Sequence, residues 1–275
     1  MAFQAFFLPG PDGSLFAIYH APDAQVADLG DLIFVPPFAE EMNRSRRMVA
    51  LQARALSGIG VGTLLIDLHG TGDSQGEFGE ARWDIWLSDI VAAARWLQRR
   101  GRHRIGLWGL RLGALLAVQA AALQAVPFDR LILWQPVIHG GAMLTQFLRA
   151  KIAATLADKG ARTTTRSIRN TLASGFTVEI AGYDLAPEMS AAIDGAELTG
   201  ATTMISVPIT WLELTQNSGE TLSPQSVKAI ELWRGIGVKL NALTIVGQPF
   251  WSLPETTIEP ALIKATCRAV AETWT

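Results

Sequence analysis

Apolar positions along the chain follow two alternating patterns, short unbroken runs and longer amphipathic stretches. The chain opens with two alternating strands, residues 3–8 and 14–21, joined by the turn GPDGS. Unbroken runs suited to strands buried on both faces follow, in DLIFVPP, VGTLLIDLHG, RIGLWGL and RLILWQPV. Stretches typical of helices separate them, at residues 43–58, 82–101 and 112–125. This order predicts an α/β fold, with a mostly parallel central sheet and helices on both faces.

The alternation of strands and helices breaks after residue 138. Residues 139–201 contain MLTQFLRAKIAATLADKG, the polar ARTTTRSIRNTLASG and EIAGYDLAPEMSAAI, an excursion best explained as mainly helical, and the strand VPITWLEL then resumes the earlier pattern. We therefore expect residues 1–138 and 202–275 to form the core and residues 139–201 to form a helical cap. Open α/β sheets bind ligands at the carboxyl edge of their strands, and we expect the cap to cover that edge.

Composition and charge exclude several classes of function. A hydrophobic fraction of 49% with 17% charged residues is typical of a packed globular protein. The formal net charge of -2 argues against nucleic acid as a partner. No apolar run is long enough to span a membrane, and the first twenty residues lack the basic start and apolar stretch of a signal peptide, so we expect a cytoplasmic protein.

Metal and disulfide sites are also not expected. The chain has one cysteine, Cys267, which excludes an internal disulfide and a cysteine-based zinc site. No grouping of histidine, aspartate and glutamate repeats at metal-ligand spacing, so we predict no metal and no cofactor.

The most informative motif is GLRLG, residues 109–113, between a buried strand and an apolar helix. Serine hydrolases carry G-x-S-x-G at such a turn, with the nucleophilic serine at its centre. Here the central residue is Arg111. Its guanidinium stays protonated and has no lone pair suited to attack, so Arg111 cannot form an acyl-enzyme.

The order of elements, the GLRLG turn and the loop DLHGTGDSQG at residues 67–76 together resemble the α/β-hydrolase fold. That loop is similar to the D-x-x-G-x-G-x-S-x-G loop of many lipase-like and peptidase-like members. With LWQPV, TQFLR and GYDLAPE, the chain most resembles hydrolase 2 of the exosortase A system, a family associated with exopolysaccharide and protein-sorting gene clusters. The resemblance implies an α/β-hydrolase fold with a helical cap and a hydrolase activity.

The usual triad cannot be carried over onto this sequence. The segment after the last strand, where the family places its histidine, reads VGQPFWSLPE and has Gln248 near that position. The loop after ITWLEL, where the carboxylate belongs, offers only Glu220. The four histidines lie elsewhere, at positions 20, 69, 103 and 139. With two of the three roles empty, serine–histidine–aspartate chemistry is not expected.

What the resemblance leaves at the turn is an oxyanion hole, made by the amide of Leu112 and an amide near Phe38. Arg111 would add a full positive charge, which makes this place a candidate anion-binding site. The alternative is that Glu40 or Glu41, in the loop facing the turn, pairs with Arg111 and plugs the pocket.

Two further residues are expected to line this pocket, Gln248 and Trp251, which follow the last strand. Two functions remain open. The first is a non-catalytic α/β-hydrolase homologue that binds an anionic or carbohydrate-linked small molecule, or a partner protein. The second is an atypical ester or thioester hydrolase, in which Glu40 or Glu41 activates water and Arg111 stabilises the oxyanion.

Overall fold

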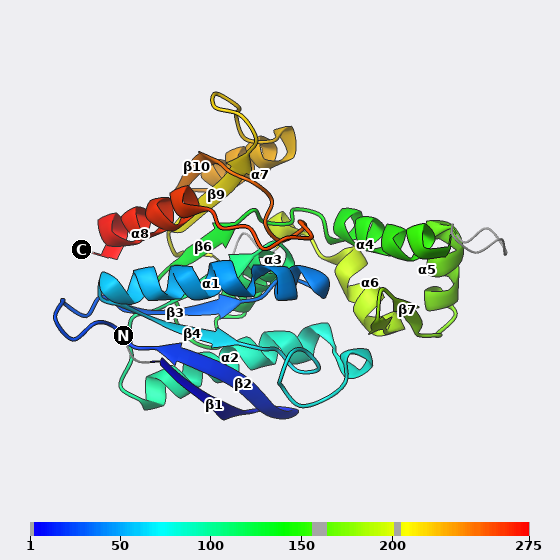
Figure 1. Ribbon diagram of the computed structural model, residues 1–275, viewed down its shortest axis with the longest axis horizontal. Coiled ribbons are helices and arrows are strands. Elements are labelled where there is room, and N and C mark those ends of the chain that lie inside the picture. The colour runs from blue at the N-terminus through cyan, green and yellow to red at the C-terminus, as the bar shows by residue number, and fades with distance from the viewer. Residues whose placement is uncertain (1–2, 156–163, 201–204, 275) are drawn as a thin grey trace.

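The computed structural model describes residues 3–155, 164–200 and 205–274. Within them, eight strands form one sheet in the order β1-β2-β4-β3-β5-β6-β9-β10 (Figure 1). The strand β2 pairs antiparallel with β1 and β4, and the other neighbouring pairs are parallel. The strands are β1 (Phe3–Gly10), β2 (Gly13–His20), β3 (Gly30–Val35), β4 (Val61–Ile66), β5 (Ile105–Leu110), β6 (Leu131–Trp134), β9 (Ile209–Thr215) and β10 (Leu240–Val246).

Helices cover both faces of this sheet. Helices α1 (Glu40–Gly58) and α8 (Pro260–Trp274) share one buried cluster, which includes Met48, Trp134 and Trp274. The other face carries α2 (Trp83–Arg99), α3 (Leu112–Ala122) and α7 (Pro224–Gly235), and a short 3-10 helix η1 (Phe78–Glu80) precedes α2. The predicted mostly parallel sheet with helices on both faces is confirmed.

Helix α3 is apolar all round because it is enclosed. It packs against the strand that precedes it, against β3 and against α2, and most of its side chains are fully buried. A helix with no polar face is stable in water only when protein surrounds it. This burial fixes the amino end of α3, and with it the residue that joins β5 to α3.

Between β6 and β9 the chain leaves the sheet. The inserted elements are α4 (Gly140–Thr155), α5 (Thr165–Ala173), β7 (Val178–Ile180), β8 (Tyr183–Leu185) and α6 (Pro187–Gly195). Figure 1 shows them beyond one end of the sheet. The ring of Phe147 lies 5.0 Å from Phe38, which follows β3, and the ring of Tyr183 lies 4.9 Å from Phe78, which follows β4. The insertion therefore packs against loops at the carboxyl ends of the strands.

The insertion also contains a two-stranded antiparallel hairpin, β7 with β8, which the expectation of a mainly helical cap did not include. Its turn is made by Ala181 and Gly182, both with positive φ, at 52° and 86°. A two-residue turn of this kind matches the twist of antiparallel strands. The sequence feature that indicates this hairpin is the pair AG between two short alternating runs.

No helix among the described residues is both long and apolar enough to cross a membrane.

Candidate functional site

Arg111 connects β5 to α3 in a backbone conformation that side chains rarely adopt. Its φ is 56° and its ψ is -119°. Its amide donates to the carbonyl of Trp134 at 3.0 Å, and its carbonyl accepts from the amide of Val137 at 3.2 Å. A non-glycine residue in such a region costs about 1–3 kcal/mol, so the surrounding structure has to enforce it.

The two glycines of GLRLG supply that enforcement. A Cβ on Gly109 would lie 2.4 Å from the Cα of Ala114, and a Cβ on Gly113 would lie 2.2 Å from the carbonyl oxygen of Val35. Only glycine permits both approaches, because no side-chain atom fits at these distances. The tight crossing of β5, α3 and the end of β3 therefore sets the backbone at Arg111.

The side chain of Arg111 forms an ion pair with Glu41. The distance from Nε to Oε1 is 3.2 Å, and the two side chains are 16% and 23% exposed. The guanidinium carbon also lies 5.5 Å from the ring centre of Trp251, within the range of a cation–π contact. Of the expected site residues, the structure thus brings Arg111, Glu41 and Trp251 together.

Glu41 is held under unfavourable conditions. Its Oε2 atom is buried and has no hydrogen-bond partner among the described residues. Burial raises the pKa of Glu41, and the nearby Arg111 guanidinium only partly opposes that rise. A buried carboxylate oxygen without a partner costs about 1–3 kcal/mol. The ion pair with Arg111 therefore keeps Glu41 at the turn although burial of its second oxygen lowers the stability of the folded protein.

The expectation that Glu40 and Glu41 lie in a loop is wrong. Helix α1 begins at Glu40, because Ala39 takes a positive φ of 51° and turns the chain into the helix. Both carboxylates therefore lie in the first turn of α1, where the helix dipole favours negative charge. Because β3 and β5 are neighbours, the amino ends of α1 and α3 meet beside Arg111.

Glu40 points to a different set of partners. It accepts a hydrogen bond from the hydroxyl of Tyr183 at 3.2 Å and pairs with Arg44 at 3.4 Å. Asn43 donates to the same hydroxyl at 3.1 Å, and Arg44 donates to the carbonyl of Ser252 at 2.6 Å. Burial and the charge of Glu40 raise the pKa of Tyr183 to about 12. The first turns of α1 thus join the insertion to the segment between β10 and α8.

The other expected site residues occupy different surroundings. Phe38 is buried among the rings of Phe78, Trp86 and Phe147. Leu112 is buried at the first position of α3, where backbone amides lack intrahelical partners. Gln248 is exposed, and its backbone amide donates to the side chain of Glu259 at 2.8 Å. Among the described residues, no hydrogen bond or ion pair joins the Gln248 side chain to Arg111.

Glu220 does not approach the turn either. It is fully exposed, accepts from the Asn217 side chain at 2.6 Å, and that hydrogen bond lowers its pKa. Sequence reasoning missed Glu213, a buried carboxylate in β9 that accepts from the amide of Ser223 at 2.9 Å and the hydroxyl of Ser226 at 2.5 Å. The sequence feature that could have revealed Glu213 is a charged residue inside the apolar run ITWLEL. These contacts fix the β9–α7 connection.

None of the described histidines contacts the Arg111–Glu41 pair through a hydrogen bond or ion pair. His139 lies 3.7 Å from Glu197 where the insertion begins. His69 is buried, and its amide donates to Asp89 at 2.8 Å. No group of three potential metal ligands occurs among the described residues.

Comparison with known proteins agrees with this architecture. A sequence model for the family described as serine aminopeptidase, S33, matches residues 31–193, more than half of the chain. One curated relative, an uncharacterized 31.7 kDa protein of the traX-finO intergenic region in Escherichia coli, is 34% identical over 73 residues, which is 26% of either chain.

Several solved structures share the fold over nearly the whole chain. Est1E from Butyrivibrio proteoclasticus, with ferulic acid bound, superposes with a TM-score of 0.69 at 19% identity, and covers 98% of this chain and 97% of its own. An α/β serine hydrolase homologue from Coxiella burnetii gives 0.59 at 18% identity, with 99% and 97% covered. Mouse α/β hydrolase domain-containing protein 10 gives 0.61 at 14% identity, with 98% and 97% covered.

Proposed function

The chain belongs to the serine aminopeptidase S33 family of α/β hydrolases, and from that premise we propose that it binds an anionic small molecule at the Arg111 turn and does not work through a serine–histidine–aspartate triad. Arginine stands where hydrolases of this fold carry serine, and no described histidine contacts it. A turn without nucleophile or base still offers a fixed positive charge and the amino end of α3.

The ion pair between Arg111 and Glu41 is the observation that carries this proposal. In it, a carboxylate of the protein already occupies the position that an anionic ligand would take on the guanidinium. An arginine in a partly buried site needs a carboxylate or another anion. The site is therefore built for a negative group, and Glu41 acts as an internal occupant.

Glu41 is an occupant that a ligand can replace. Its Oε2 has no hydrogen-bond partner among the described residues, and burial raises its pKa, so Glu41 loses its negative charge by protonation more easily than an exposed glutamate. A ligand carboxylate or phosphate can bind Arg111 through two oxygens and accept from the amide of Leu112. Such a ligand would gain contacts that Glu41 lacks.

The chemical class of the ligand follows from the surroundings. Trp251 places an aromatic ring beside the guanidinium, which favours a flat or sugar-like group next to the charge. The resemblance to hydrolases of the exosortase A system suggests a uronic acid from exopolysaccharide metabolism. Est1E, the similar structure with ferulic acid bound, also holds a carboxylic acid.

The test is a comparison of anion binding by the wild type and three variants, using calorimetry and thermal melts with glucuronate, acetate and phosphate. We expect glucuronate to stabilise the wild type and to bind more tightly to Glu41→Gln, which removes the competing charge but keeps the shape. Arg111→Gln should lose the response, whereas Arg47→Gln, an exposed arginine on α1, should keep it. If no anion stabilises the wild type or Glu41→Gln, or if Arg111→Gln responds as the wild type does, the proposal is wrong.

A second function has one observation in its favour. The Oε2 atom of Glu41 has no hydrogen-bond partner among the described residues, so a water molecule would find an acceptor there, on the same carboxylate whose Oε1 lies 3.2 Å from Nε of Arg111. Glu41 would then activate water for ester or thioester hydrolysis, and Arg111 would stabilise the oxyanion. Turnover of acyl esters or thioesters that disappears in Glu41→Gln, without labelling of any serine by a fluorophosphonate, would favour this function over simple binding.

A further inference from the structure

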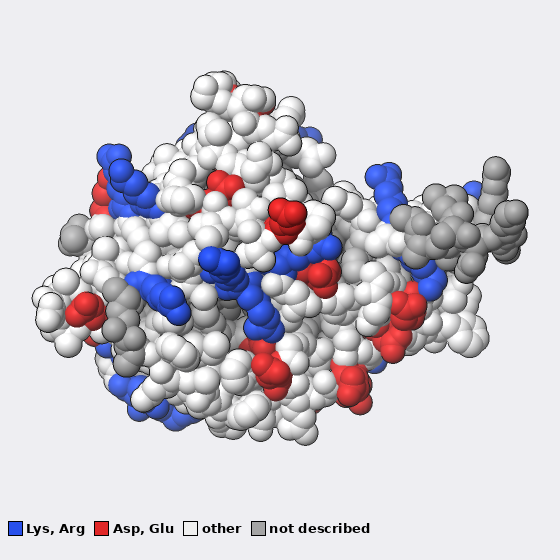
Figure 2. Space-filling model, in the orientation of Figure 1, with Lys and Arg blue, Asp and Glu red and all other residues white. Residues whose placement is uncertain are grey.

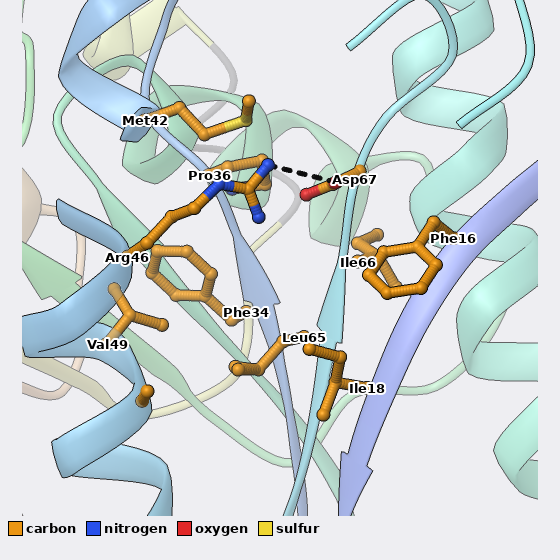
Figure 3. A pocket seen from close by; sticks show the side chains of 11 residues that line it. Phe16, Ile18, Phe34, Pro36, Met42, Arg46, Val49, Leu65, Ile66 and Asp67 are labelled. Carbon is orange, nitrogen blue, oxygen red and sulfur yellow. Dashed lines mark hydrogen bonds and ion pairs between the residues drawn. The ribbon is translucent and has the colours of Figure 1, made fainter. Parts of the chain in front are cut away.

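A cavity lies away from the Arg111 turn, between α1 and the strands β2, β3 and β4. Its volume is about 200 Å³. Most of its lining is apolar, and Figure 3 shows these side chains converging from the helix on one side and the strands on the other. The apolar lining includes Phe16, Ile18, Phe34, Val49, Leu65 and Ile66.

One end of this cavity is charged. Arg46 extends from α1 across the end of the cavity toward Asp67, which follows β4 (Figure 3), and its Nη2 lies 3.1 Å from Oδ2 of Asp67. The amide of Asp73 donates to the same Oδ2 at 3.0 Å. Among the described residues, no donor is bonded to Oδ1 of Asp67 and no further acceptor to Arg46, whose side chain is 44% exposed.

The cavity mouth therefore offers a cation with free donors and an anion with a free acceptor, side by side above an apolar space. We propose that this cavity binds a free α-amino acid with an apolar side chain, with its carboxylate on Arg46 and its ammonium group on Asp67. The carboxylate and the ammonium group of an α-amino acid are attached to the same carbon. They can therefore contact Arg46 and Asp67 at the same time, because these two side chains lie 3.1 Å apart. A ligand with a single charge would satisfy one partner and repel the other.

The size and walls of the cavity select the side chain. An engineered apolar cavity of about 150 Å³ holds one benzene molecule, so a space of about 200 Å³ accommodates a phenyl or isobutyl group. Phe16 and Phe34 supply aromatic rings on two walls, which favour an aromatic guest through edge or offset contacts. Phenylalanine is therefore the probe that fits best.

This site is independent of the proposed function. The cavity is lined by Pro36 and Met42 on the side toward the turn, and Arg111 is not part of its lining. Figure 2 shows basic side chains over α1, the helix that supplies Arg44, Arg46, Arg47 and Arg54. Arg46 is the one of these that lines the cavity.

The experiment measures L-phenylalanine binding by calorimetry and by thermal melts of the purified protein. We expect saturable binding to the wild type, and binding at least about tenfold weaker for 3-phenylpropionate, which lacks the ammonium group, and for phenethylamine, which lacks the carboxylate. L-Phenylalaninamide, which keeps the ammonium but not the carboxylate, should resemble phenethylamine.

Two pairs of variants locate the site. Ala50→Phe fills the cavity from α1 and should abolish binding while the protein still folds, whereas Ala55→Phe on the same helix, outside the lining, should leave binding unchanged. Arg46→Gln should weaken binding at least about tenfold, and Arg47→Gln should not. Arg111→Gln should bind as the wild type does. The proposal is overturned if the wild type shows no saturable binding, if binding survives Ala50→Phe or is lost in Arg111→Gln, or if 3-phenylpropionate binds as tightly as L-phenylalanine.

Discussion

Asp89 on α2 makes the stability of this protein depend on pH in a direction opposite to that of an ordinary salt-bridged carboxylate. The side chain is fully buried, its Oδ2 accepts from the amide of His69 at 2.8 Å, and its Oδ1 has no partner among the described residues. Burial raises the pKa of Asp89 from 3.8 to about 7, and the charge of Asp12 adds to the rise. The proton therefore binds more tightly in the folded state than in the unfolded chain.

The size of the effect follows from the two pKa values. Each pH unit between them corresponds to about 1.4 kcal/mol, so ionisation of Asp89 costs the folded state about 4 kcal/mol. Because the folded pKa is the higher one, the contribution of Asp89 to stability is fully present below about pH 4. It is lost as the pH rises toward about 7, and the loss is complete above that value.

Asp89→Asn removes the ionisation and keeps an oxygen that can accept from the amide of His69. We expect the free energy of unfolding of this variant, relative to the wild type, to increase by about 3 kcal/mol between pH 5 and pH 8.5, because about two pH units of this window lie below the folded pKa of about 7. Urea denaturation across this range gives both curves, and Asp84→Asn, an exposed carboxylate on the same helix, serves as the control. A difference that stays constant with pH would refute the reasoning, because it would show that Asp89 ionises alike in both states.

Three further substitutions test the packing by chemical denaturation. Ala39→Gly should stabilise the protein by about 1 kcal/mol, because glycine adopts the φ of 51° without strain. Gly113→Ala should destabilise it by more than about 3 kcal/mol, since the new Cβ would lie 2.2 Å from the carbonyl oxygen of Val35. Arg102→Ala should cost about 3–5 kcal/mol, because it leaves the fully buried Asp31 without its cation. Opposite signs for the first two, or no loss for the third, would contradict these assignments.

The sequence predicted the sheet and its helices well because each element carries its own signal. Strands buried on both faces read as unbroken apolar runs, and α3 reads as an apolar helix, whatever the rest of the chain does. The turn at residue 111 was equally visible, since Gly109 and Gly113 mark the close approach of backbones that defines it.

The start of α1 and the partner of Arg111 were harder to predict. Nothing in the sequence around Ala39 indicates a positive φ, which is imposed by packing, so Glu40 and Glu41 were expected in a loop. The sequence did suggest, as one alternative, that Glu40 or Glu41 pairs with Arg111. Which of the two does so depends on where α1 begins, because that sets the direction in which each side chain points. The cavity beside α1 depends on contacts between segments far apart in the sequence, which no local pattern records.

The backbone at Arg111 has the form that a catalytic nucleophile requires, but this form alone is not evidence of catalysis. The crossing of β5, α3 and β3 forces it through Gly109 and Gly113, whatever residue stands between them. The functional information therefore lies in the side chain and its neighbours. Arg111→Ser tests this separation, because it places a hydroxyl at the tip of the turn without changing the two glycines.

We expect Arg111→Ser to fold with the same turn and to lose stability, by about 1–3 kcal/mol, because Glu41 is left without its cation in a partly exposed site. We also expect no ester turnover and no reaction with a fluorophosphonate, since no described histidine lies in hydrogen-bond contact with this pair and a serine hydroxyl is a weak nucleophile without a base. The measurement is mass-spectrometric detection of labelling at position 111. Labelling above that of the wild type would show that a neighbouring group, with Glu41 the nearest candidate, activates the hydroxyl, and the site would then retain a general base.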